Sequence, residues 1–241
     1  MMFSGGCMKQ LLLISNSTLH GSGYLDHCAE EISSFLDDRK HVLFVPYARP
    51  GGITHDEYTE TAKKRFEQLG KTLQGIHEFE DKTKAINDHD AVFIGGGNTF
   101  VLTTMLYKNG VIKPLSKAIE NGTAYIGTSA GSNVACQSIR TTNDMPIMYP
   151  PSFDGLKCVP FNINPHYIDP DSTSTHMGET RETRIKEFHV YNDVPVIGLR
   201  EGAMILCQDD SYILKGSFGA RLFMPRKEAR ELTIGEEIKQ I

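Results

Sequence analysis

The stretch Ala124-Tyr125-Ile126-Gly127-Thr128-Ser129-Ala130-Gly131 is the part of this sequence that decides its fold class. Its first three residues are apolar and predict a buried strand, and a helical pattern follows the last glycine. A serine at the apex of such a strand-turn-helix unit matches the G-x-S-x-G nucleophile elbow. Glycines flank the serine because a Cβ on either side would collide with the neighbouring strand or helix. The pattern is typical of an α/β sheet that presents a serine at its edge.

The elbow gives Ser129 a chemical environment as well as a position. Its hydroxyl is lifted clear beside the N-terminus of a helix, where free N–H groups can stabilise an oxyanion. Small residues around a serine also form ordinary tight turns, so the motif alone does not establish a hydrolase. The rest of the chain has to decide between these two interpretations.

Short apolar runs alternate with helical patterns along the first half of the chain. This alternation predicts an α/β fold with a mostly parallel sheet and helices on both faces. Later apolar runs predict a β-rich C-terminal end whose strand order is open. The strands are expected at 10–15, 41–46, 91–94, 124–127, 194–199, 203–207, 211–214 and 221–224, and the clearest helices at 24–36 and 55–69.

The loops with chemical content follow the predicted strands. Asn16-Ser17-Thr18 comes after the first strand, Gly95-Gly96-Gly97-Asn98 after the strand that begins at Ala91, and the serine turn after the next. The carboxyl ends of parallel strands meet at one edge of a sheet, which is where ligands bind in open α/β folds. We therefore expect one site at this edge.

Length and charge limit the organisation and the partners of the protein. The chain has 241 residues and a net charge of −5, and no linker or charge run divides it. It is expected to form one domain over residues 1–241, with residues 1–8 as a disordered extension. Because acidic and basic residues are interspersed, the sequence shows no basic cluster that would bind nucleic acid. We expect a monomer or a homodimer.

Cysteine usage and the N-terminus indicate the compartment. The five cysteines form no C-x-x-C pair, which argues against a disulfide framework and against a zinc site. They are typical of the reduced thiols of a cytoplasmic protein. Leu11–Ile14 is the longest apolar run near the N-terminus and is too short for a signal-peptide core or a membrane span. We expect no membrane partner.

A nucleophilic serine needs a base and an orienting carboxylate. Among nine histidines, His166 stands out because it follows Asn164-Pro165 in a segment without helical period. Glu201 follows a predicted strand and is expected at the same sheet edge as Ser129, whereas Asp144 precedes a proline loop. Sequence spacing does not choose between these two acids.

The tetrahedral intermediate needs two converging N–H donors. The Ala130 N–H, directly after the nucleophile, supplies one of them by the geometry of the elbow. Gly97 is the first choice for the second, because a residue without a side chain lets the backbone approach the substrate. No Lys-Ser/Thr follows the glycine run, so a phosphate-binding P-loop is disfavoured.

A series of motifs, in order from about residue 9 to about 202, resembles the peptidase E family of α-aspartyl dipeptidases. The resemblance weakens after Leu206. The motifs are Ser15-Asn16-Ser17-Thr18, Gly95-Gly96-Gly97-Asn98-Thr99-Phe100, Gly127-Thr128-Ser129-Ala130-Gly131, the RTTNDMPI run of residues 140–147, Ile163-Asn164-Pro165-His166-Tyr167, Gly178-Glu179-Thr180-Arg181 and Gly198-Leu199-Arg200-Glu201-Gly202.

The resemblance implies a cytosolic serine peptidase on a fold like that of class I glutamine amidotransferases. The family's nucleophile falls on Ser129, its base on His166 and its third member on Glu201. An alternative assignment within the family gives Asp144 an active-site role. The family's oxyanion donors fall on Gly97 and Ala130, and its chemistry needs no metal or cofactor.

The implied substrates are dipeptides with an N-terminal aspartate. Such a residue carries a carboxylate, which a cation with planar donors binds well, and an ammonium, which needs acceptors. The family resemblance gives the first task to Arg181, although its neighbours also read as the charged face of a helix. Asn98 is expected at the substrate as well.

The chain departs from the commoner family pattern at two places. Thr128 precedes the serine where an aromatic residue is often found, which is expected to alter the pocket wall. One extra residue separates His166 from Arg181, in the polar stretch 169–175, which is expected to form a mobile loop over the site.

Other functions stay open at this stage. A cyanophycinase-like hydrolase would use the same triad on β-aspartyl linkages. A non-catalytic binding module on an amidotransferase-like fold would use Ser129 only at a helix start. A glutaminase is disfavoured because that chemistry normally places cysteine at the elbow.

Overall fold

The computed structural model describes residues 9–170, 173 and 178–239. Their strands are β1 (Gln10–Ile14), β2 (His41–Val45), β3 (Thr72–Gly75), β4 (Ala91–Ile94), β5 (Ala124–Thr128), β6 (Asn162–Tyr167), β7 (Val196–Arg200), β8 (Ala203–Gln208), β9 (Ser211–Gly216), β10 (Ala220–Phe223) and β11 (Arg230–Leu232). The α-helices are α1 (Ala29–Leu36), α2 (His55–Gln68), α3 (Lys82–Asp88), α4 (Thr99–Lys108), α5 (Ile112–Glu120), α6 (Ala130–Val134) and α7 (Arg181–Tyr191).

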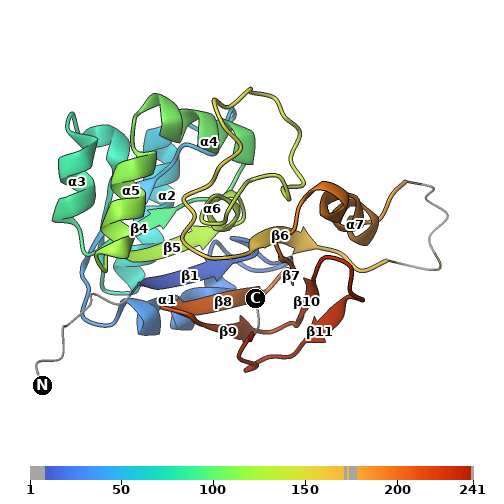
Figure 1. Cartoon of the computed structure of the whole chain (residues 1–241). Coiled ribbons are helices and arrows are strands. Elements are labelled where there is room, and N and C mark those ends of the chain that lie inside the picture. Colours follow the sequence, from blue (N-terminus) through green and yellow to red (C-terminus); the bar gives the residue numbers. More distant parts are fainter. Residues whose placement is uncertain (1–8, 171–172, 174–177, 240–241) are drawn as a thin grey trace, which may run out of the picture.

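The main sheet has seven strands in the order β3-β2-β4-β5-β1-β8-β9 (Figure 1). Its first five strands run parallel, and β8 and β9 extend it as an antiparallel edge. Four of these parallel strands, β1, β2, β4 and β5, are buried almost throughout, as the apolar runs predict. The predicted α/β fold with a mostly parallel sheet is confirmed.

Helices cover both faces of the main sheet. Alternate strand residues such as Leu12, Phe44 and Phe93 pack with α1 and α2 on one face. The intervening residues, including Leu11 and Val92, pack with α3, α4, α5 and α6 on the other. The alternation follows from the period of two residues in a strand, which sends neighbouring side chains to opposite faces.

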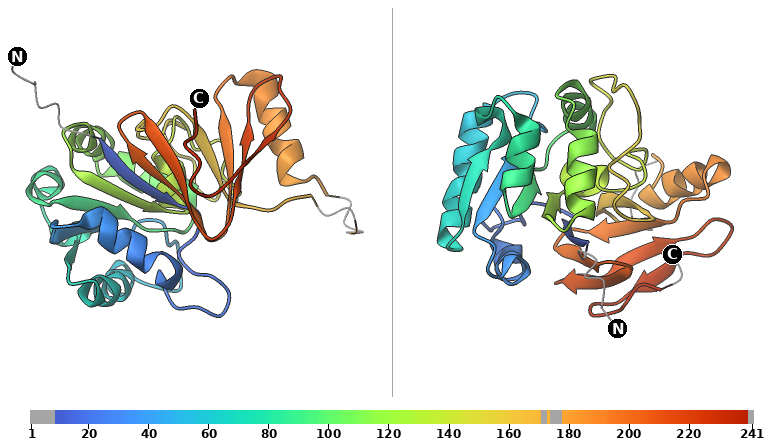
Figure 2. Two further views of the ribbon diagram at one scale, coloured as in Figure 1. Left: turned by 90° about the horizontal axis from the view of Figure 1, so that it is seen from below. Right: turned by 60° about the vertical axis from the view of Figure 1, so that its left-hand side comes forward.

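A second sheet of four strands, β11-β10-β7-β6, lies beside the antiparallel edge of the first (Figure 2). Residues from both sheets, among them Ile163, Ile197 and Ile205, share one buried cluster. The other face of the second sheet packs against α7 through Ile185 and Tyr167. The β-rich end expected from the sequence is thus divided between two sheets.

Three strands were not expected from the sequence: β3, β6 and β11. The strand β6 has the sequence NINPHY, in which asparagines and a proline interrupt the apolar character. It is nonetheless buried along most of its length and pairs in parallel with β7. Tertiary pairing has overridden a weak local β propensity here.

Candidate active site

Ser129 lies directly after β5 with φ 51°, a left-handed value that only a few per cent of non-glycine residues adopt. Its N–H donates to the Ile14 carbonyl at 3.0 Å. A Cβ on Gly127 would lie 2.6 Å from the Gly131 carbonyl carbon, and a Cβ on Gly131 would lie 2.2 Å from the Ile94 oxygen. The collisions expected for any residue but glycine are therefore present on both sides of the serine.

His166 brings its imidazole to the serine from the end of β6. Its Nε2 lies 2.9 Å from Ser129 Oγ, and its Nδ1 lies 2.7 Å from Glu201 Oε1. A carboxylate accepts a hydrogen bond from Nδ1–H, which leaves Nε2 as the acceptor for the serine hydroxyl. Sequence-predicted Ser129, His166 and Glu201 thus form one chain of contacts.

The backbone at His166 is as unusual as at the serine. Its φ is 52°, and the β6–β7 register shifts between Pro165 and Tyr167. Such an irregularity re-aims a side chain at the end of a strand. The proline and the strand end together turn the imidazole toward Ser129, although the sequence does not indicate a strand here.

Glu201 follows β7, and β7 belongs to the second sheet. The expectation that Glu201 lies at the same sheet edge as Ser129 was therefore wrong about the sheet. The carboxylate still reaches the site because the two sheets converge near the end of β1. There, the Gly202 N–H next to Glu201 donates to Asn16 Oδ1 at 2.8 Å.

Ser15 is a buried polar residue that joins three elements of the site. Its hydroxyl donates to the Leu199 carbonyl of β7 at 2.8 Å and accepts the His166 N–H at 2.9 Å. The sequence placed the loop after the first strand at the site but gave no role to this serine. The signal that could have indicated such a role is a polar residue at the carboxyl end of a buried strand.

Asp144 forms no hydrogen bond or ion pair with His166 or Ser129 in the described structure. Its Oδ2 accepts hydrogen bonds from the Thr99 N–H and the Thr99 hydroxyl, both at 2.7 Å, and lies 3.0 Å from Thr142 Oγ1. These contacts tie it to the first turn of α4. Of the two acids left open by the sequence, Glu201 is the one at the histidine.

The glycine run supplies backbone close to the serine. Gly97 has φ +147°, and a Cβ there would lie 2.3 Å from the Ala48 oxygen. A Cβ on Gly96 would lie 3.2 Å from Ser129 Cβ, so the run packs directly against the serine. Within the described residues, the Gly97 N–H has no acceptor, and Ala130 starts its helix and has no intrahelical one.

Asn98 uses its side chain to hold the start of α4. Its Oδ1 accepts the Val101 N–H at 3.1 Å, and its Nδ2 donates to the Met145 carbonyl at 2.9 Å. Both ends of the amide are occupied, so a contact of this side chain with substrate, expected from the family resemblance, stays a prediction.

Arg181 begins α7 and lines a small cavity of about 50 Å³ together with Arg140, Arg184 and Asn164. Burial and the charge of Arg184 lower the pKa of Arg181, and the charge of Asp144 opposes this. No carboxylate among the described residues forms an ion pair with Arg181. The neighbouring Glu182 instead fits the interpretation of a charged helix face. It forms ion pairs with Lys186 and with Arg221, at 2.8 Å each.

The two departures from the family pattern have different outcomes. Thr128 is fully buried, so its side chain forms no exposed part of the pocket wall. The stretch 169–175 lies largely outside the described residues. Its first residue, Asp169, pairs with Arg200 on β7 at 2.7 Å, and this contact holds the pKa of Asp169 below its usual value.

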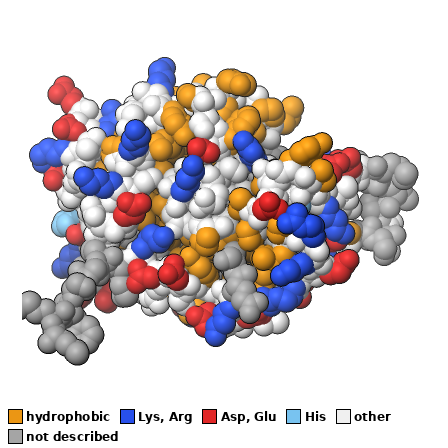
Figure 3. Space-filling view, in the orientation of Figure 1, with side chains coloured by type: hydrophobic (Ala, Val, Ile, Leu, Met, Phe, Trp, Pro, Cys, Tyr) orange, Lys and Arg blue, Asp and Glu red, His pale blue; other side chains and the backbone are white. Residues whose placement is uncertain are grey.

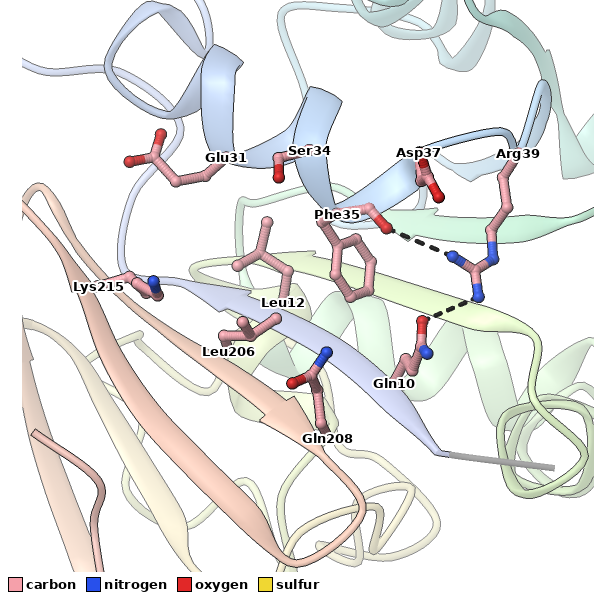
Figure 4. Close-up of a pocket in the computed structure, with 10 residues that line it drawn as sticks. All are labelled: Gln10, Leu12, Glu31, Ser34, Phe35, Asp37, Arg39, Leu206, Gln208 and Lys215. Atoms are coloured by element: carbon pink, nitrogen blue, oxygen red, sulfur yellow. Dashed lines mark hydrogen bonds between the residues drawn. The ribbon is translucent and has the colours of Figure 1, made fainter. Parts of the chain in front are cut away.

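A larger groove lies elsewhere, between α1 and the strands β1, β8 and β9 (Figure 4). It is lined by Gln10 at the start of β1, and Arg39 donates there to Gln10 Oε1 at 2.8 Å. The predicted site residues follow the other end of β1, after Ile14. This groove is therefore separate from the catalytic constellation.

The described cysteines are not placed for nucleophilic chemistry. Cys28, Cys136, Cys158 and Cys207 are free and buried, and burial raises the pKa of Cys28 and of Cys158 to about 12. Thiols in such surroundings are inert.

In the part of the chain that the structure describes, no three His, Cys, Asp or Glu side chains form a metal-binding group. No helix there is long and apolar enough to cross a membrane.

The chain is similar to proteins of one peptidase family. The model of peptidase family S51 matches residues 11–215. A protein named peptidase E from Streptomyces coelicolor is 48% identical over 96% of this chain and 94% of its own length. A Drosophila melanogaster protein named "Probable alpha-aspartyl dipeptidase" is 45% identical over 93% of each chain.

Solved structures support the fold. The crystal structure of a peptidase from an acI-B1 Actinobacterium superposes with a TM-score of 0.73, at 17% identity, over 97% of this chain and 98% of that one. With the family match over most of the chain and a serine elbow in contact with a histidine, the chain belongs to peptidase family S51.

Proposed function

We propose that this protein is a serine dipeptidase that hydrolyses dipeptides with an N-terminal α-aspartyl residue. The observation that carries the proposal is the chain of contacts from Ser129 Oγ to His166 Nε2 at 2.9 Å and from His166 Nδ1 to Glu201 Oε1 at 2.7 Å. The names of the relatives, peptidase E and alpha-aspartyl dipeptidase, point to the same activity.

The contacts assign a step to each group. Ser129 attacks the peptide carbonyl while His166 takes its proton, and His166 then returns the proton to the leaving amine. Glu201 fixes the tautomer of the imidazole and stabilises its protonated form. The N–H groups of Gly97 and Ala130 hold the oxyanion, and water then releases aspartate from Ser129.

Arg181 supports the choice of substrate. Its guanidinium lies in a cavity of the described structure without a carboxylate partner, and a partly buried arginine favours a bound anion. The β-carboxylate of an N-terminal aspartate would supply that anion. A neutral side chain at the same position would leave the arginine partly buried and unpaired, which costs binding energy.

Hydrolysis of three dipeptides by the purified protein tests the proposal. We expect rapid cleavage of Asp-Leu and at least about 100-fold lower kcat/KM for Glu-Leu and isoAsp-Leu, because a misplaced scissile bond loses most of the catalysis. Preferred cleavage of isoAsp-Leu would favour the β-aspartyl alternative. Cleavage of none of the three would contradict the proposal.

A further inference from the structure

Three consecutive glycines follow β4, and residues 95–97 are called the oxyanion loop below. In the function proposed above, on which this inference rests, the Gly97 N–H binds the oxyanion. Gly96 and Gly97 share one peptide group, which is planar and trans, so the Gly96 carbonyl and the Gly97 N–H point in opposite directions. The partner of the carbonyl therefore also decides where the N–H points.

The peptide group between these two glycines rotates more easily than most. Glycine populates positive and negative φ about equally, because it has no Cβ. Hydrogen bonds fix the ends of the oxyanion loop on either side of this peptide group. The Gly95 N–H donates to the Val45 carbonyl at 3.3 Å, and the Asn98 N–H donates to the Ala48 carbonyl at 2.7 Å. A flip of the peptide between these ends would turn a carbonyl oxygen, in place of an N–H, toward the oxyanion.

Tyr58 of α2 holds this peptide group by its carbonyl. The Tyr58 side chain is 2% exposed, and its hydroxyl donates to the Gly96 carbonyl at 3.1 Å. A Cβ on Gly95 would lie 2.5 Å from the Tyr58 hydroxyl oxygen, so the hydroxyl lies directly against the loop backbone. A flipped peptide would leave the buried hydroxyl hydrogen without this acceptor, which costs free energy.

The ring of Tyr58 is itself held on several sides. Its centre lies 5.0 Å from that of Phe44 in β2 and 6.3 Å from that of Tyr24, both in edge-on contacts. The guanidinium of Arg49 lies 5.0 Å from the same ring centre. These contacts fix the position of the hydroxyl before substrate arrives, and preorganisation of this kind is what a positioning group needs.

We propose that Tyr58 is a positioning residue that sets the oxyanion hole, because its hydrogen bond to the Gly96 carbonyl keeps the Gly97 N–H directed at the oxyanion. In the described structure Tyr58 forms no hydrogen bond with Ser129 or His166, so it acts only through the peptide group. A carbonyl that accepts a hydrogen bond also makes the N–H of its own peptide group a stronger donor. The effect belongs to the transition state, in which the oxyanion forms.

Tyr58→Phe tests this proposal, since it removes the hydroxyl and keeps the ring. We expect kcat on Asp-Leu to fall by about 10- to 100-fold, a part of the loss that follows removal of an oxyanion donor. The Kd of Asp-Leu, measured by calorimetry in a Ser129→Ala background, should change less than about threefold, because uncleaved substrate carries no oxyanion. Binding at full stoichiometry also shows that the variant is folded.

A trifluoromethyl ketone analogue of aspartate, with the ketone carbon in place of the scissile carbonyl carbon, measures the oxyanion hole itself. Ser129 Oγ bonds to the ketone carbon, the serine proton passes to His166, and the ketone oxygen becomes an oxyanion. In Tyr58→Phe the Ki of this analogue should rise by about the factor by which kcat/KM on Asp-Leu falls. A merely structural role would not move the Ki of the ketone while the Kd of Asp-Leu stays constant.

Tyr107→Phe is the matched control. The Tyr107 hydroxyl also donates to a backbone carbonyl, that of Asp154 at 3.4 Å, and its loss should leave kcat and the Ki of the ketone within about twofold. Near-normal kcat in Tyr58→Phe, or an equal weakening of Asp-Leu and ketone binding, would overturn the proposal. Failure of wild-type enzyme to cleave Asp-Leu would instead overturn the proposed function, and this inference with it.

Discussion

Three residues of the site have a positive φ, which is costly for any residue other than glycine. Ser129 and His166 have φ values of 51° and 52°, and Gly97 has φ +147°. Each non-glycine outlier of this kind costs roughly 1–3 kcal/mol and persists only where its surroundings fix it. Here the fixed surroundings are the glycine contacts on both sides of Ser129 and the Ser15 hydroxyl at the His166 N–H.

At the residue scale, the histidine contact separates the two candidate acids. We expect Glu201→Gln to lower kcat on Asp-Leu by about 10³-fold or more with little change in KM, because an amide no longer enforces the imidazole tautomer that accepts the serine proton. Steady-state kinetics on Asp-Leu measures this.

The exposed Glu30 on α1 supplies a matched control for the loss of one carboxylate. Glu30→Gln should leave kcat within about twofold, since isolated surface charges contribute little. Near-normal kcat in Glu201→Gln would show that another group orients His166.

At the scale of elements, β1 connects both sheets to the catalytic groups. Ser15, at its carboxyl end, contacts the backbone of β6 at His166 and of β7 at Leu199, and Asn16 contacts the turn after Glu201. The base and its acid therefore share one support. A change at this support should act on the His166–Glu201 pair without touching substrate.

We expect Ser15→Ala to lower both stability and kcat. It leaves the half-buried His166 N–H and the buried Leu199 carbonyl without their partner, which costs about 1–3 kcal/mol of unfolding free energy. Urea unfolding measures the first effect, and kcat at saturating Asp-Leu measures the second. KM should change little, because Arg181 is untouched.

Ser34 in α1 is an exposed serine suited as the control. Ser34→Ala should shift the unfolding free energy by no more than about 0.5 kcal/mol. If Ser15→Ala lowers stability but leaves kcat unchanged, Ser15 has only a structural role.

The elements that the sequence predicted well are those with strong local patterns. Continuous apolar runs gave β1, β2, β4 and β5 within about a residue of their ends, because strands buried on both faces need such runs. The strand β6 was missed because Asn162, Asn164 and Pro165 interrupt the apolar pattern that predicts a buried strand. The two asparagines serve tertiary contacts, such as that of Asn164 Nδ2 with the Thr141 carbonyl at 2.8 Å, that no local pattern reveals.

At the scale of the whole molecule, the sequence predicted the main sheet and the position of Ser129 on it. It did not predict that Glu201 reaches the site from a second sheet, because pairing between distant strands leaves no local signal. The position of Asp144 was unpredicted for the same reason. It depends on Thr99, which lies far from Asp144 in the chain and next to it in the fold.

The surface beside the site adds a feature that only the folded molecule reveals. The loop after Asp144 carries exposed apolar side chains, including Met145 at 75% and Tyr149 at 90% exposure. Figure 3 shows hydrophobic atoms along the upper side of the molecule, where Figure 1 draws this part of the chain. This loop thus presents exposed apolar side chains close to Asp144 in the chain.

The most direct test of the central claim is hydrolysis of Asp-Leu by Ser129→Ala beside wild-type enzyme. Removal of the nucleophile should lower kcat by about 10⁴-fold or more and leave the unfolding free energy at or above its wild-type value, since alanine removes only the catalytic hydroxyl. Cleavage of Asp-Leu at a rate near that of wild-type enzyme would contradict the assignment of Ser129 as the nucleophile.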